Sequence, residues 1–307
     1  MAASSILMSK ETLPDAIVDI IAILSCDTFQ IWARSWRGVA RRFMSLSWYS
    51  ENVRSDFVEV HSQSRFASLQ EGMRQTVLRS LQVLIVHPGT YRESLRVTRN
   101  LLIVGWGNRE DVIIDAPGWE PALVFAGLGT NSSHNVMGVS GKDTGDRAAV
   151  CNLTLCGRNQ HQAVVAHIVR GQPSLCACNV HGCIFISGSG TGPSITRCHI
   201  RSSRSSGIRV TDHSSPFLQF NLVTHNSGYG VHIDRGSAPI LKHNIVTQNG
   251  IQNIAASEGS AAVLTMNEID SVQVILEMRR DLIKVSIHVK GIIYVNEQDE
   301  HEWLHGE

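Results

Sequence analysis

Apolar and polar positions recur at a constant interval through the second half of the chain. Proline stands at three positions that share an interval of 23 (216 − 193 and 239 − 216), and Ala262 takes the next one: Pro193, Pro216 and Pro239. An apolar residue lies two positions after each of these: Ile195, Leu218, Leu241 and Leu264. A fixed interval of this length predicts a repeat architecture in which each unit is one supersecondary element.

Each unit contains two or three short alternating stretches that end at Gly, Asn, Ser or Pro, which is too short for a helical pair or a propeller blade. It suits one coil of a parallel β-helix. There the inward residue of each strand stacks on its equivalent one coil along, about 4.8 Å away, and the backbone hydrogen bonds run between coils. We therefore expect a mainly β fold, a right-handed parallel β-helix of roughly eight to ten coils, over residues 81–270.

A second set of equivalent positions carries amides. Asn221, Asn244 and Asn267 keep the interval of 23 (244 − 221 and 267 − 244), and Cys198 occupies the position one unit earlier. Asparagine tolerates the left-handed backbone of a sharp corner, and its amide can bond to the equivalent amide of the next coil. We expect these four residues to form a structural ladder without chemistry.

The segments that flank the repeat are expected to complete its ends. Residues 83–125 contain short apolar stretches separated by turn residues, but at no constant interval, which predicts irregular first coils. An apolar helical stripe within the linker 51–80 predicts a helix that caps the open end of the stack: Phe66, Leu69, Met73 and Val77. Residues 127–146 read as a long loop, and 271–307 as a C-terminal cap with an acidic tail.

Residues 1–50 predict two short amphipathic helices. Thr12, Pro14 and Asp15 supply an N-terminal capping signal for the first helix. The apolar face of the first helix contains Leu13, Ile17, Ile20, Ile21 and Leu24. The apolar face of the second helix contains Phe29, Trp32, Trp36, Ala40 and Phe43. Two helices this short cannot bury these faces alone, so they pack either on the β-helix or on a partner.

Charge and composition limit the classes of partner and the cellular compartment that we expect. Lys plus Arg and Asp plus Glu are both 27, which argues against nucleic acid or an anionic membrane recognised through bulk electrostatics. No apolar run approaches the roughly 20 residues of a membrane span, and the N-terminus lacks the pattern of a secretory signal. We expect a cytoplasmic protein, with cytoskeletal association as a further option, and interpret the seven cysteines as reduced thiols.

Two stretches resemble known families. The segment Leu13-Pro14-Asp15-Ala16-Ile17, with Ile20-Ile21, Leu24, Asp27-Thr28-Phe29 and Ala33-Arg34-Ser35-Trp36-Arg37, resembles an F-box. The segment Val86-His87-Pro88-Gly89-Thr90-Tyr91-Arg92-Glu93, followed by Leu101-Leu102-Ile103-Val104-Gly105, is similar to the first coil of β-helix proteins with carbohydrate-binding and sugar-hydrolase (CASH) repeats. Together they resemble the F-box only proteins that carry right-handed β-helix repeats.

This resemblance implies a protein partner and a separate role for each part of the chain. The β-helix would hold a substrate, and the F-box-like face would contact the small linker subunit of an SCF-type ubiquitin ligase through six residues: Leu13, Pro14, Ile17, Ile21, Leu24 and Phe29. The first functional hypothesis is therefore a non-catalytic substrate adaptor, with no cofactor. The second is a structural component of a large cytoskeletal or flagellar assembly, in which the same apolar face packs against neighbouring subunits.

The third hypothesis is a sugar-active enzyme, because parallel β-helices often act on polysaccharides. Its best candidates are Asp212 and Asp234, which lie one coil apart within one residue of register, with four basic or imidazole side chains nearby: Arg209, His213, His232 and Arg235. No second aspartate stacks in register with either one. We therefore interpret them as turn residues and expect no catalytic site.

A metal site is the other chemical option. Four cysteines cluster near two histidines: Cys176, Cys178, Cys183 and Cys198, with His181 and His199. The spacing Cys-x-Cys-x4-Cys is not that of a recognised zinc site. We expect these thiols to fill space in the core and predict no metal.

Overall fold

The computed structural model describes residues 58–61, 67–78, 83–118, 120–126, 148–157, 164–257 and 259–269, and the backbone of three later strands at 274–276, 284–286 and 293–295. The F-box-like segment 1–50, Phe66 and the predicted loop 127–146 lie outside the described residues.

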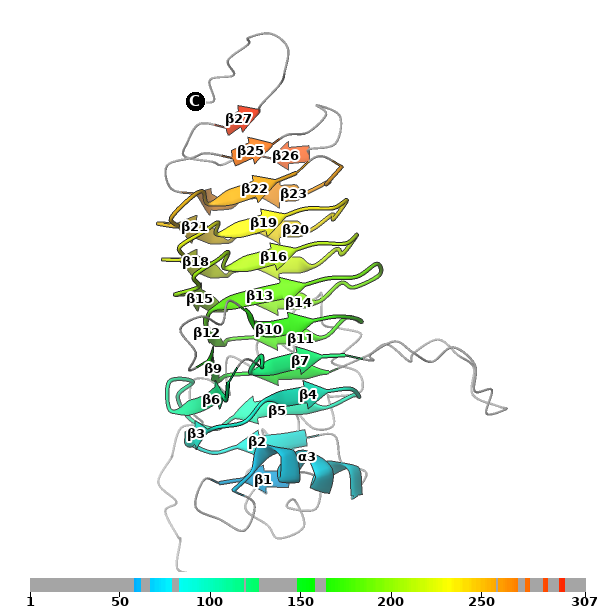
Figure 1. Cartoon of the computed structure of the whole chain (residues 1–307), viewed down its shortest axis with the longest axis vertical. Coiled ribbons are helices and arrows are strands. Elements are labelled where there is room, and N and C mark those ends of the chain that lie inside the picture. The colour runs from blue at the N-terminus through cyan, green and yellow to red at the C-terminus, as the bar shows by residue number, and fades with distance from the viewer. Residues whose placement is uncertain are drawn as a thin grey trace, which may run out of the picture.

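The described chain is a stack of coils whose strands form three parallel sheets (Figure 1). Sheet A contains, in spatial order, β1 (Val58–Val60), β2 (Val83–Val86), β5 (Leu102–Gly105), β8 (Ala149–Cys151), β11 (Ser174–Cys176), β14 (Ser194–Thr196), β17 (Phe217–Gln219), β20 (Ile240–Lys242), β23 (Val263–Thr265) and β26 (Lys284–Ser286).

The other two sheets complete each coil. Sheet B contains β3 (Gly89–Tyr91), β6 (Val112–Ala116), β9 (Thr154–Gly157), β12 (Asn179–His181), β15 (His199–Arg201), β18 (Leu222–Thr224), β21 (Ile245–Thr247) and β24 (Glu268–Ile269). Sheet C contains β4 (Leu95–Val97), β7 (Leu123–Phe125), β10 (Val164–Ile168), β13 (Cys183–Ile186), β16 (Ile208–Val210), β19 (Val231–Ile233), β22 (Ile254–Ala256), β25 (Val274–Leu276) and β27 (Ile293–Val295). The mainly β solenoid predicted from the repeat is confirmed.

The interval found in the sequence corresponds to one coil. In sheet A, Ile195 pairs with Leu218, and Leu218 pairs with Leu241, an interval of 23 in both cases (218 − 195 and 241 − 218). Earlier coils differ in length, because Leu175 pairs with Val150 at an interval of 25 (175 − 150) and with Ile195 at an interval of 20 (195 − 175). Unequal coils of this kind conceal the period in the first half of the sequence.

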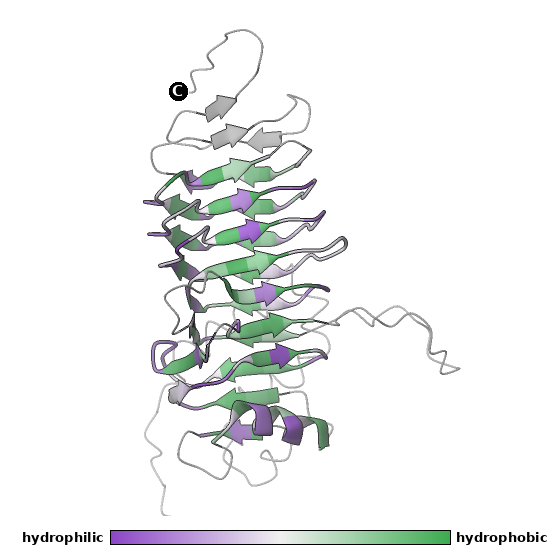
Figure 2. Ribbon diagram, in the orientation of Figure 1, coloured by the Kyte–Doolittle hydropathy of each residue, from purple (hydrophilic) through white to green (hydrophobic). Residues whose placement is uncertain are grey.

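The core is the inside of the stack. Most strands of three residues bury one or two side chains and turn the others outward, as in β16, where Ile208 and Val210 are buried around the outward Arg209. Figure 2 shows the resulting apolar strands along the stack, with polar positions at the turns and on the outer faces. Each inward residue packs on its equivalents in the neighbouring coils, so no coil is stable alone.

The asparagine ladder joins consecutive coils at the corner between sheets A and B. The Oδ1 atom of Asn244 accepts from the backbone N–H and the Nδ2 of Asn221, both at 3.0 Å. Asn267 Oδ1 accepts in the same way from Asn244, at 2.9 and 3.0 Å, and Asn221 Oδ1 accepts the N–H of Cys198 at 2.9 Å. All four residues are buried.

The ladder residues do not themselves adopt the left-handed backbone expected of them. That conformation belongs to the residue before each one: Arg197, Phe220, His243 and Met266, with φ of 54, 55, 53 and 52°. The asparagine amides accept backbone N–H groups at the corner, where the strands no longer pair. These hydrogen bonds help to hold the left-handed residue before each ladder position, which need not be glycine.

Helix α3 (Leu69–Leu78) packs on β1 and β2 at the first coil (Figure 1). Two members of the expected stripe face the core, since Leu69 is buried and Met73 packs against it. Leu69, Gly72 and Thr76 are buried, whereas Val77 is 57% exposed. A Cβ on Gly72 would lie 2.3 Å from Val60 Cγ2. Gly72 therefore allows the helix to lie close to Val60.

The stack extends beyond residue 270, where the sequence suggested a cap. Strands β25 and β27 continue sheet C, and β26 continues sheet A. Within the described part of the chain, no helix is long and apolar enough to cross a membrane.

Candidate functional site on the outer face of sheet C

The outward residues of sheet C form one column that crosses the coils. Strand pairing places them in register from β4 to β22: Arg96, Val124, His167, Phe185, Arg209, His232 and Ala255. Figure 2 shows the polar stretches that this column creates on β4, β10, β16 and β19. Histidine, arginine and aromatic side chains thus line one outer face at the spacing of the coils, about 4.8 Å.

Arg209 and Asp234 form the electrostatic centre of this face. Arg209 Nη2 and Nε donate to Oδ2 of Asp234, which lies in the following coil, at 2.9 and 3.3 Å. The Asp234 side chain is 11% exposed and that of Arg209 is 40% exposed. Burying a carboxyl group without a polar partner is costly, and Arg209 supplies the partner.

Aromatic contacts extend the face on both sides of this pair. The Arg209 guanidinium carbon lies 5.8 Å from the centroid of the Phe185 ring, which in turn lies 5.0 Å from the His167 ring. On the other side, the Tyr229 and His232 ring centroids are 4.7 Å apart. Flat rings and a guanidinium plane held side by side offer stacking surfaces that end in hydrogen-bonding groups.

Both histidines of the column have lowered pKa values, which favour the neutral imidazole. Burial lowers the pKa of His167 below its usual value. Burial also lowers the pKa of His232, and the Arg209 charge acts in the same direction while Asp234 opposes it. A neutral imidazole can accept a proton.

Asp212 lies apart from this centre. It pairs with Arg235 of the next coil at 3.1 Å, and both side chains are well exposed. Asp212 and His213 share a turn with left-handed backbone, at φ of 57 and 61°. The structure therefore separates the two aspartates that the sequence grouped: Asp234 contacts the column through Arg209, whereas Asp212 pairs with Arg235.

The clustered cysteines lie in the core. Cys176, Cys178, Cys183 and Cys198 are all buried as free thiols. Burial raises the pKa of Cys183 to about 12 and raises that of Cys198, where Cys178 adds to the effect. For Cys176 the hydrogen bond with Cys151 is the main cause of its raised pKa, followed by burial. Among the described residues, these thiols do not form a group that could hold a metal ion.

Sequence reasoning missed Phe185 and His167, because they precede the regular coils and do not share their constant interval. It also missed a second ladder, in which Asn226 Nδ2 donates to Asn249 Oδ1 at 3.0 Å, although their interval is 23 (249 − 226). The one group in the described residues that could hold a metal, Glu59 with His61 and His87, lies at the first coil.

Comparisons with known proteins support the fold. A family model for a right-handed β-helix region matches residues 182–286, so the solenoid is right-handed in that region. No curated protein matches the sequence. Among solved structures, the pectin methylesterase from Aspergillus niger is similar at 12% identity and a TM-score of 0.45, over 78% of this chain and 84% of that chain. A likeness this remote does not assign that enzyme's reaction to this chain.

These findings correct the first functional hypothesis. The matched family is a β-helix, and the matched structure is an enzyme named for pectin, which contradicts the expectations of a non-catalytic ubiquitin-ligase adaptor and of a chain that is not an enzyme. That match does not by itself show an activity of this chain. No comparison shows an F-box, and the six residues proposed to contact a linker subunit lie outside the described residues.

Proposed function

We propose that this chain binds a polysaccharide along the outer face of sheet C and hydrolyses ester groups on it. The observation that carries the proposal is the unbroken series of contacts from His167 through Phe185 to the Arg209–Asp234 pair, with His232 next in the column. Sugar rings stack on aromatic faces, and their hydroxyls bond to charged planar groups. The rise of one coil is comparable to the length of one sugar residue.

The protonation states favour base-assisted chemistry. Glycosidases use a pair of carboxyl groups at the scissile bond, whereas Asp234 is bonded to Arg209 and Asp212 lies apart from it. Neutral His232 can instead take a proton from water, and the water oxygen then attacks the ester carbonyl. Arg209 lies in the adjacent position to stabilise the oxyanion, and the leaving alkoxide receives the proton from His232.

Affinity electrophoresis tests the binding. The full chain is run through gels that contain methyl-esterified pectin, de-esterified polygalacturonate or a neutral glucan. Retardation in at least one gel is expected, and Phe185→Ala should abolish it. Arg201→Ala is the matched control, because Arg201 lies outward on β15 in sheet B. Migration unaffected by every polysaccharide would refute the binding proposal.

A pH-stat measurement of acid release from methyl-esterified or acetylated polysaccharide tests the reaction. His232→Ala should abolish release but leave the retardation intact, since the base acts after binding. Equal release by this variant and the unaltered chain would exclude His232 as the base. Binding without any release would reduce the function to polysaccharide recognition alone.

A further inference from the structure

A second group of chemically active side chains lies on a different face, at the first coil. Glu59 lies outward on β1, His61 follows that strand, and His87 follows β2. The pairing of Val60 with Val86 places the two histidines in register on adjacent coils. Their rings stack with centroids 3.6 Å apart and planes 17° apart.

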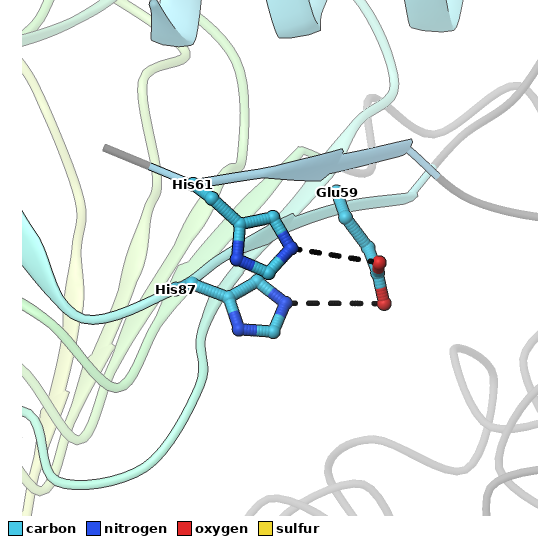
Figure 3. Close-up of side chains that lie close together, drawn as sticks. All are labelled: Glu59, His61 and His87. Atoms are coloured by element: carbon cyan, nitrogen blue, oxygen red, sulfur yellow. Dashed lines mark ion pairs between the residues drawn. The ribbon is translucent and has the colours of Figure 1, made fainter. Parts of the chain in front are cut away.

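Both imidazoles face the same carboxylate. His61 Nε2 lies 3.7 Å from Glu59 Oε2, and His87 Nε2 lies 3.8 Å from Glu59 Oε1 (Figure 3). Potential ligand atoms of the three residues all lie within 4.8 Å of one another. Tetrahedral ligands of zinc, with metal–ligand bonds of about 2.0–2.1 Å, would be about 3.3 Å apart. The two distances from Glu59 to the histidines are thus a few tenths of an ångström wider than in a loaded site, a difference that side-chain rotation can remove.

One buried nitrogen in the group points to an occupant. His87 Nε2 is buried and has no hydrogen-bond partner, since Glu59 lies beyond hydrogen-bonding distance. An orphaned nitrogen of this kind is costly. The Glu59 and His61 side chains are 36% and 42% exposed, so an ion can enter from solvent.

We propose that Glu59, His61 and His87 bind a divalent transition metal ion, with Zn²⁺ the best match. Two imidazoles and one carboxylate are a ligand set that zinc uses, and neither calcium nor magnesium favours imidazole. Three protein ligands leave a fourth position for water or a small anion. The site is independent of the polysaccharide face, because it lies on sheet A and shares no residue with the column of sheet C.

Calorimetric titration of the metal-stripped full chain with Zn²⁺ tests the site. Glu59→Gln and His87→Ala should each remove one equivalent of bound zinc or weaken it beyond the roughly 10–100-fold that outer-shell changes cost. His243→Ala is the matched control, because His243 also belongs to a stacked ring pair, with Phe220 at 5.1 Å. The control should keep the full stoichiometry.

The comparison between variants is essential because thiols elsewhere in the chain can also bind zinc. Co²⁺ gives a second measurement, since visible absorption of a four-coordinate nitrogen and oxygen site differs from the thiolate charge-transfer bands of a cysteine site. Glu59→Gln is nearly isosteric at a partly exposed position, and circular dichroism checks that it folds.

Two results would overturn the proposal. One is the absence of zinc binding by the unaltered chain. The other is equal zinc stoichiometry and affinity in the unaltered chain, Glu59→Gln, His87→Ala and His243→Ala. Ni²⁺ quenching provides a local check: Trp106 lies 5.9 Å from the His87 ring. Trp106→Phe should remove the quenching but leave the binding, and quenching that survives this change would place the ion elsewhere.

Discussion

Arg209 holds the buried carboxylate of Asp234 across the boundary between two coils, at 2.9 Å. One ion pair thus connects the stacking of β16 on β19 to the chemistry of the outer face. The two residues are 25 apart in sequence (234 − 209), two more than a coil, because the arginine lies mid-strand and the aspartate follows the next strand. Mutation can separate the contribution of the pair to stability from its contribution to the chemistry of the outer face.

Arg209→Ala should lower the free energy of unfolding by about 1–2 kcal/mol, less than a fully buried pair because Arg209 is partly exposed. The loss comes from the carboxylate left without a cation. Arg209→Ala with Asp234→Asn should recover most of it, which a double-mutant cycle by urea denaturation would measure. Equal destabilisation in the single and double variants would show that the arginine stem, not its charge, stabilises the turn.

Asn244→Ala should cost about 2–4 kcal/mol, because it leaves two donors of Asn221 and an acceptor, the Leu218 carbonyl, without partners. Urea unfolding followed by far-ultraviolet circular dichroism measures the effect. Lys242→Ala, two residues away on the outer side of β20, serves as the control and should change little. A loss no larger than that of the control would mean that the ladder contributes nothing net.

Stability should fall as the pH drops below neutral. Burial is the largest cause of a lowered pKa at five histidines: His87, His167, His181, His199 and His232. Each therefore binds a proton more readily when unfolded, so its stabilising effect is complete above the unfolded value of about 6.5 and is lost as the pH falls towards the folded one. Thermal midpoints at pH 7.5, 6.5 and 5.5 should decline, and less steeply in His232→Gln; a flat profile would contradict this.

Gly72→Ala should destabilise the chain although the same change stabilises most helices by about 1 kcal/mol. The new methyl would lie 2.3 Å from Val60 Cγ2 and 2.9 Å from Leu84 Cδ1, so α3 must move off the first coil. We expect a net loss of about 1–3 kcal/mol. Gln70→Ala, in the first turn of α3 and exposed, is the control; a higher thermal midpoint for Gly72→Ala would show that the helix accommodates the methyl.

The repeat made the stack predictable from sequence. Equal spacing of Asn221, Asn244 and Asn267 translates directly into register, because a parallel β-helix advances one coil per period. The same reasoning explains which contacts the sequence did not predict. His167 and Phe185 lie in coils of unequal length, and His61 meets His87 at an interval of 26 (87 − 61), which no neighbouring coil repeats. Their proximity depends on pairing that only coordinates show.

Side-chain orientation was less predictable than position. In the sequence, Asp212 and Asp234 are one residue out of register, and this offset separates their side chains. Asp212 pairs with Arg235 in an exposed turn, whereas Asp234 pairs with Arg209 on sheet C. In helix α3 the stripe predicted Leu69 and Met73 on the core side, but it did not predict the buried Gly72 or the exposed Val77.

The equal coils also make the length of the molecule adjustable in whole units. Excision of residues 216–238 would bring Pro239 to the place of Pro216, and Leu241 would then pair with Ile195 as Leu218 does now. The shortened stack would have one fewer layer between its two ends and matching inward positions, but Arg209 would lose Asp234 and the column would lose His232. Insertions and deletions of one complete coil therefore preserve the register of the core strands while changing the outer face.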